Sequence, residues 1–162
     1  MGEIMLSEFE FNRIMDEFAG SIFRLAMVKT RNKQDAEDVF QDVFMKLYKS
    51  GKTFESDDHI KAWLIKVTVN TSLDLLKAFW HNHMVELDEE IPFQDESDHF
   101  LWEEIKKLSE KYRVPLHLYY YEGYSTDEIA EILHEKPATT RSKLHRGRVI
   151  LSERMGDSYE WI

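Results

Sequence analysis

The chain has 162 residues, enough for one domain or two small ones, and its 43% hydrophobic and 13% aromatic content excludes wholesale disorder. It contains no cysteine, which rules out disulfides and thiolate metal sites, and no apolar run long enough to span a bilayer. Its formal net charge of -10 works against unaided binding to DNA, because overall negative charge weakens the attraction to phosphates.

The first 82 residues predict three amphipathic helices, at about 7–29, 35–49 and 60–79, with a loop at 50–58 and no strand-like alternation. The segment before them has acids but no basic stretch ahead of an apolar run, so we expect no signal peptide and a cytoplasmic protein. The side chains expected in the common core are Phe11, Ile14, Met15, Phe18, Ile22, Leu25 and Ala26, then Val39, Val43, Phe44 and Leu47, then Trp63, Leu64, Val67 and Leu76.

The second of these helices carries a polar face opposite its core stripe. Asp35, Asp38, Gln41 and Asp42 recur at spacings of three and four residues, which places them on one side of a helix. A solvated surface has the same pattern, and acids in a first turn also complement the helix dipole. Spacing alone therefore favours a solvated face, with a protein interface as the alternative.

Two other groups of polar residues are candidates for a functional role. Asn70 and Asp74 lie one turn apart on the third helix, where capping of a neighbouring segment and contact with nucleotide bases are both open. His81 and His83 lack the second ligand pair of a recurrent zinc spacing. With no glycine-rich phosphate loop and no nucleophile elbow, the sequence predicts no enzyme, no metal and no cofactor.

Acidic residues mark a division of the chain. Between Glu86 and Asp98 there are seven acids, no Lys or Arg, and Pro92 in the middle, which indicates an extended linker. A second helical unit begins beyond it with the apolar residues Phe100, Leu101, Ile105 and Leu108. We therefore predict an all-α protein of two small helical domains, 1–83 and 99–162, joined by an acidic linker at 84–98.

Residues 124–151 predict a helix-turn-helix that ends in a basic helix. Ser125 and Glu128 have the spacing of a capping box, and Pro137 suits the first turn of the second helix after a break at 134–136. The expected inward face consists of Thr140, Leu144, Gly147 and Leu151. Five Lys or Arg and no acid between 136 and 148 favour an anionic partner such as the DNA major groove, with a solvated basic face as the alternative.

Together these segments resemble the bacterial RNA polymerase sigma factors of the small extracytoplasmic-function (ECF) type over nearly the whole chain. Residues 35–44 (DAEDVFQDVF) match that family's polymerase-binding helix, and residues 62–74, which begin AWLIKVTVN, match its helix that reads the minus-ten promoter element. Residues 112–130, with YRVPL and EGYSTDEIA, match the approach to the minus-thirty-five reader. Residues 138–148 (ATTRSKLHRGR) match its recognition helix.

The resemblance implies a sigma factor that binds core RNA polymerase and promoter DNA and performs no chemistry of its own. The residues that would contact the coiled-coil clamp of the largest polymerase subunit are Asp38, Gln41 and Asp42. Those that would contact the minus-ten strand are Asn70 and Asp74, with the loop near Phe54. Those that would contact the minus-thirty-five duplex are Thr139, Arg141, Ser142, His145, Arg146 and Arg148.

The same resemblance implies that the acidic linker threads the polymerase's RNA channel, and an anti-sigma factor is a further candidate partner. The alternative is a stand-alone helix-turn-helix regulator whose first domain senses a signal or dimerises, and which would need palindromic sites. Gly147 stands where that family usually has alanine. A glycine inside a helix costs about 0.5–1 kcal/mol relative to alanine, so we expect looser last turns in the recognition helix.

Overall fold

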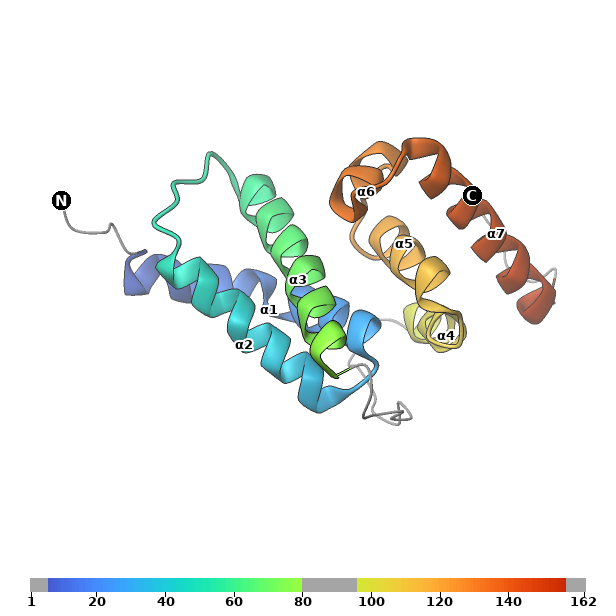
Figure 1. The fold of residues 1–162 in the computed structure, drawn as a ribbon, viewed down its shortest axis with the longest axis horizontal. Coiled ribbons are helices and arrows are strands. Elements are labelled where there is room, and N and C mark those ends of the chain that lie inside the picture. Colours follow the sequence, from blue (N-terminus) through green and yellow to red (C-terminus); the bar gives the residue numbers. More distant parts are fainter. Residues whose placement is uncertain (1–5, 80–95, 157–162) are drawn as a thin grey trace. The chain divides into compact units, whose positions relative to one another are not determined.

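The computed structural model describes residues 6–79 and 96–156, and the side chains of 6–75 and 101–156. Over these residues the chain forms seven helices and no strand (Figure 1). It divides into two compact units, Met1–Glu89 and Glu90–Ile162, which confirms the predicted all-α class with two domains. The first part of the predicted linker, through residue 95, lies outside the described residues, and its last three residues belong to a helix that begins at Glu96.

Three helices, which pack pairwise on one another, form the first unit: α1 (Glu8–Thr30), α2 (Lys33–Lys49) and α3 (Asp57–Phe79). Polar side chains fix where the first two begin. The Ser7 hydroxyl accepts a hydrogen bond from the backbone N–H of Glu10, and the Asn32 side-chain oxygen accepts one from Asp35. All three helices begin and end within three residues of their predicted bounds.

Apolar side chains from all three helices form the core of this unit. The four residues expected from α2 are all buried. Five of the seven expected from α1 are buried, and the other two, Phe11 and Met15, are half-buried. None of the described helices has an apolar stretch long enough to cross a membrane.

The prediction for the core side of α3 is partly wrong. Trp63 and Val67 are only half-buried, and the side chain of Leu76 lies outside the described residues. The buried side chains are instead Ile60, Leu64, Ile65, Thr68, Val69, Thr71 and Ser72. The Thr68 hydroxyl donates to the Leu64 carbonyl oxygen at 2.6 Å, so this polar group is satisfied inside the helix and fits the core.

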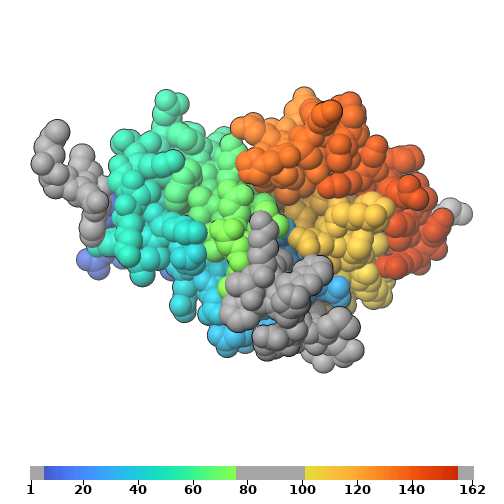
Figure 2. Space-filling model, in the orientation of Figure 1, coloured from blue at the N-terminus to red at the C-terminus, as the bar shows by residue number. Residues whose placement is uncertain are grey.

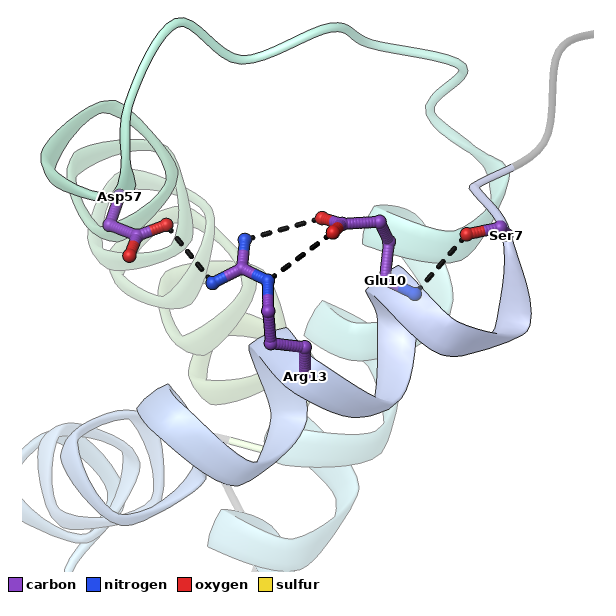
Figure 3. A network of polar contacts seen from close by, with 4 residues as sticks. All are labelled: Ser7, Glu10, Arg13 and Asp57. Carbon is purple, nitrogen blue, oxygen red and sulfur yellow. Dashed lines mark hydrogen bonds and ion pairs between the residues drawn. The ribbon is translucent and has the colours of Figure 1, made fainter.

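Arg13 joins the first turns of α1 and α3 (Figure 3). Its guanidinium donates to both carboxylate oxygens of Glu10, at 3.3 and 3.2 Å, and to Oδ1 of Asp57 at 3.2 Å. The hydrogen bond to Glu10, and then the one to Asp57, raise the pKa of Arg13 above its ordinary value. Because Asp57 is the first residue of α3, this network fixes where the loop from α2 ends.

Four helices form the second unit: α4 (Glu96–Ile105), α5 (Glu110–Tyr120), α6 (Thr126–Leu133) and α7 (Pro137–Met155). α7 packs against each of the other three. The predicted Leu101, Ile105 and Leu108 are buried, and so is Trp102, which the sequence analysis did not assign to the core. On the face shown in Figure 2, the atoms of α5 to α7, gold through red, lie against one another.

α6 and α7 form the predicted helix-turn-helix. The Ser125 hydroxyl accepts from the backbone N–H of Glu128 at 3.2 Å, and the Glu128 carboxylate accepts from the N–H of Ser125 at 3.0 Å, which confirms the capping box. α6 is followed by His134 in the left-handed region, with a φ of 56°, and α7 begins at Pro137. The four residues predicted to face inward from α7 are all buried.

Glu135 fastens the turn to α7. One of its carboxylate oxygens accepts from the Thr140 hydroxyl at 2.7 Å, and the other accepts from the Lys143 ammonium at 2.6 Å. Thr140 is fully buried, so this hydrogen bond satisfies a polar group in the core. The spacing of the sequence indicated neither contact, and one of the five basic side chains of this region is therefore neutralised within the unit.

Gly147 is required by the packing of α5 against α7. α7 continues as a helix through Gly147 to Met155. A Cβ atom on Gly147 would lie 2.7 Å from Cδ1 of Leu116 and 3.4 Å from Cβ of Tyr112, both on α5. The missing side chain is what allows the two helices to approach this closely.

Candidate functional site

The outer face of α7 collects the polar residues predicted to bind DNA. Five of the six are exposed: Thr139, Arg141, Ser142, His145 and Arg146. Thr140, Leu144, Gly147 and Leu151 are buried on the opposite side of α7, so this face is turned toward solvent. α7 therefore offers three hydrogen-bonding groups and two arginines on one surface, a set suited to base edges and phosphates in a major groove.

The basic side chains of this face differ in how they are held. Lys143 is paired with Glu135, whereas no ion pair holds Arg141 or Arg146 among the described residues. Arg148 is half-buried and lies against two tyrosines of α5. Its guanidinium carbon is 4.9 Å from the ring centre of Tyr119, and its Nε donates to the Tyr120 hydroxyl at 2.8 Å.

The outer face of α7 also has an apolar member, which the sequence did not single out. Val149 follows Arg146 and His145 by about one turn and is 43% exposed. An apolar side chain beside arginines on a major-groove helix can contact the methyl group of thymine. Its only signal in the sequence is helical spacing from residues that were already assigned to the interface.

The polar face of α2 lies in solvent. Asp38, Gln41 and Asp42 are all exposed, while Asp35, which accompanies them in the sequence pattern, is half-buried in the first turn. Met45 continues the same face and is 52% exposed, although the sequence analysis gave it no role. The unbranched side chain of methionine can adapt to the surface of a protein partner.

A groove of about 400 Å³ between α2 and α3 brings two predicted sites together. It is lined by Asp38, Val39, Asp42, Lys46, Thr71, Asp74 and Leu75. The Lys46 ammonium lies 3.1 Å from a carboxylate oxygen of Asp42 and donates to the Thr71 hydroxyl at 3.0 Å, so it ties the two helices. Asp74, predicted to lie against DNA, thus shares a groove with Asp38 and Asp42, predicted to bind polymerase.

Aromatic side chains hold the loop between α2 and α3. Phe54 packs edge-on against His59 and Trp63, with ring centres 5.4 and 5.8 Å apart, and the Lys52 ammonium lies 5.6 Å from the Trp63 ring centre. This cluster explains why Trp63 is absent from the core, since its ring covers the loop. Asn70 is exposed farther along α3 and does not line the groove.

A metal site finds no support in the part of the chain that the structure describes. Over residues 6–79 and 96–156, no group of three or more His, Cys, Asp or Glu side chains is arranged to hold a metal ion. His81 and His83, weighed as metal ligands from the sequence, lie outside these ranges.

Two family models match separate parts of the chain. The model described as Sigma-70 region 2 matches residues 14–81, which includes most of α1 and all of α2 and α3. The model described as Sigma-70, region 4 matches residues 101–151, from the end of α4 into α7. The two matches fall on the two compact units.

Curated relatives match over most of their length. RNA polymerase sigma factor SigV of Bacillus subtilis (strain 168) is 31% identical over 130 residues, which cover 76% of this chain and 78% of that protein. ECF RNA polymerase sigma factor SigW of the same organism is 25% identical over 167 residues, covering 91% and 89%.

Solved structures share the fold. The sigma factor RpoE of Bartonella quintana, in complex with the anti-sigma factor NepR, aligns with a TM-score of 0.75 and 22% identity over 92% of this chain and 98% of that one. CnrH, in complex with the cytosolic domain of CnrY, aligns with a TM-score of 0.63 and 20% identity, covering 94% and 92%.

Proposed function

This chain belongs to the extracytoplasmic-function sigma factors of RNA polymerase, and we propose how its two units divide the work of promoter-specific initiation. The first unit binds core polymerase through the outer face of α2 and meets the minus-ten element with α3 and the loop at Phe54. The second unit places α7 in the major groove of the minus-thirty-five element. A stand-alone regulator, the alternative from the sequence, is not favoured by the comparisons.

One observation carries the assignment of the second unit. α7 buries an uninterrupted inward stripe and leaves Arg141, Ser142, His145 and Arg146 together in solvent. A helix whose exposed side consists of bidentate donors and small polar groups is what reading of base edges requires. Within residues 6–79 and 96–156, Arg141 and Arg146 form no ion pair, which leaves their charge for DNA.

The assignment of the first unit rests on the exposed carboxylates of α2. Asp38 and Asp42 lie one turn apart beside Gln41, and Met45 follows about one turn later, so the surface combines carboxylates with one exposed apolar side chain. Such a surface suits a basic partner protein and repels nucleic acid. For Asn70 and Asp74, the support is that both side chains are exposed one turn apart on α3, where unpaired bases of the minus-ten strand can reach them.

The test of the first unit is a charge reversal. Asp38→Arg combined with Asp42→Arg should weaken core polymerase binding by at least tenfold, because like charges at a protein contact cost several kcal/mol. Asp16→Arg combined with Glu17→Arg is the matched control, since both residues are exposed on α1 and have no assigned role. If the two variants bind core polymerase with equal affinity in an anisotropy titration, the polar face of α2 is a solvated surface and not an interface.

We also propose an anti-sigma factor as a third partner. The support is the fold alone, because the proteins NepR and CnrY named above are seen on chains of this architecture. An anti-sigma factor would compete with core polymerase for the chain. A protein from the source organism that binds the purified chain and is released by core polymerase would meet this description.

A further inference from the structure

We propose that Tyr119 and Tyr120 of α5 are positioning residues that hold Arg148 as a clamp for a DNA backbone phosphate. This inference rests on the proposed reading of the minus-thirty-five element by α7 and assigns a separate task to one of its arginines. The tyrosines have no place in that proposal. They lie 28 and 29 residues before Arg148 in the chain, and only the fold brings them to it.

The two rings and the hydroxyl fix the guanidinium from two directions. Tyr119 and Tyr120 stand edge to face with ring centres 5.0 Å apart, and the Arg148 guanidinium lies over both, 4.9 and 5.7 Å from their centres. The bond from Nε to the Tyr120 hydroxyl, at 2.8 Å, sets the orientation of the guanidinium plane. An arginine held in this way has already lost rotamer freedom that it would otherwise lose on binding.

The remaining donors of Arg148 are free to bind an anion. Its one Nε–H is used by Tyr120, and its four terminal N–H groups meet no partner among the described residues. Those groups form a planar fork that matches two oxygens of a phosphate. The free edge of the guanidinium is therefore the part that a phosphate recognises.

The position of Arg148 on α7 favours the backbone over the bases. It is half-buried beside the inward stripe, whereas the candidate base readers Ser142 and Arg146 point fully outward. It shares a side of the helix with Arg141, seven residues or roughly 10 Å earlier, given a rise of 1.5 Å per residue. A side chain at the edge of a groove-bound helix reaches the sugar-phosphate strand, and such contacts position the protein without reading sequence.

The experiment measures binding of the holoenzyme to a promoter fragment selected from a randomised library and to a scrambled duplex, over a range of salt concentrations. Arg148→Ala should weaken both by the same factor, roughly tenfold at low salt, and reduce the slope of log affinity against log salt by about 0.9. The matched control is Arg154→Ala, which removes the same charge from an exposed position about 120° around α7. Arg154→Ala should leave the slope of log affinity against log salt unchanged.

Tyr120→Phe tests the positioning role, because it removes only the hydroxyl. It should weaken binding to both duplexes roughly threefold, keep the salt slope of the wild type, and have no further effect in an Arg148→Ala background. An equal loss in both backgrounds would mean that Tyr120 acts on stability alone and would overturn the proposal. So would a change in base preference with Arg148→Ala, or an unchanged slope. A wild-type holoenzyme that does not prefer the promoter would instead refute the proposed function itself.

Discussion

Replacement of Gly147 by alanine sets two physical effects of opposite sign against each other. Alanine in the interior of a helix is favoured over glycine by about 0.5–1 kcal/mol. The new Cβ would lie 2.7 Å from Cδ1 and 3.3 Å from Cγ of Leu116, whereas carbon atoms pack best at about 3.5–4.0 Å. Leu116 is fully buried, so it has little room to rotate away. Inserting a methyl group into a packed core costs about 1–3 kcal/mol.

The larger effect is the packing, and we expect Gly147→Ala to destabilise the second unit by about 1 kcal/mol. The control is Gly20→Ala in α1, where the new Cβ would meet only Nη1 of Arg24 at 3.6 Å, an ordinary contact. That variant should stabilise the first unit by about 0.5–1 kcal/mol, since propensity acts there alone.

Native-state hydrogen exchange read by mass spectrometry is the suitable assay, because peptides from α5–α7 and from α1 report on each unit separately. A second variant isolates the clash: in a Leu116→Ala background, Gly147→Ala should no longer destabilise. Equal stabilisation by Gly147→Ala and Gly20→Ala would refute the reasoning, because the close approach of α5 and α7 would then have no energetic consequence.

Three further sets of substitutions test the helix-turn-helix. Thr140→Val removes the 2.7 Å hydrogen bond to Glu135 and should destabilise the second unit by about 1.5 kcal/mol, measured by the same exchange assay. Ser125→Ala removes the capping box and should cost about 1 kcal/mol, whereas Ser125→Gly should cost only a few tenths; equal losses would contradict the capping role. Alanine at Arg141 or Arg146 should reduce run-off transcription from promoters that depend on the upstream element, and unchanged strength and base preference in both variants would exclude them as readers.

The helices of the first unit and the helix-turn-helix were predictable because local spacing and capping residues mark them. The inward stripe of α7 follows from four residues that recur at spacings of three and four. The start of α6 follows from the spacing of Ser125 and Glu128. The buried side of α3 was not predictable in the same way, because it contains Thr68 and Ser72. A threonine that bonds to its own helix can enter a core, so hydrophobic periodicity fails to mark that side.

The candidate site was predictable as a set of outward-facing residues but not as an arrangement. The groove that joins Asp74 to Asp38 depends on the packing of α2 against α3, which no spacing within one helix encodes. The same holds for Arg148, whose tyrosine partners come from another helix. The sequence gives Lys143 as one of five basic residues available to an anionic partner. Only the structure shows that the Glu135 carboxylate pairs with it.

The most direct test of the central claim is a mobility-shift titration of the purified chain on promoter DNA, with and without core polymerase. The net charge of -10 and the small number of free basic side chains on α7 limit counterion release. The chain alone should therefore bind weakly or not at all at physiological salt. Core polymerase should produce tight, promoter-specific binding, because it fixes both units on the DNA at once. Nanomolar, sequence-specific binding by the chain alone, unchanged by core polymerase, would contradict the division of work between the two units.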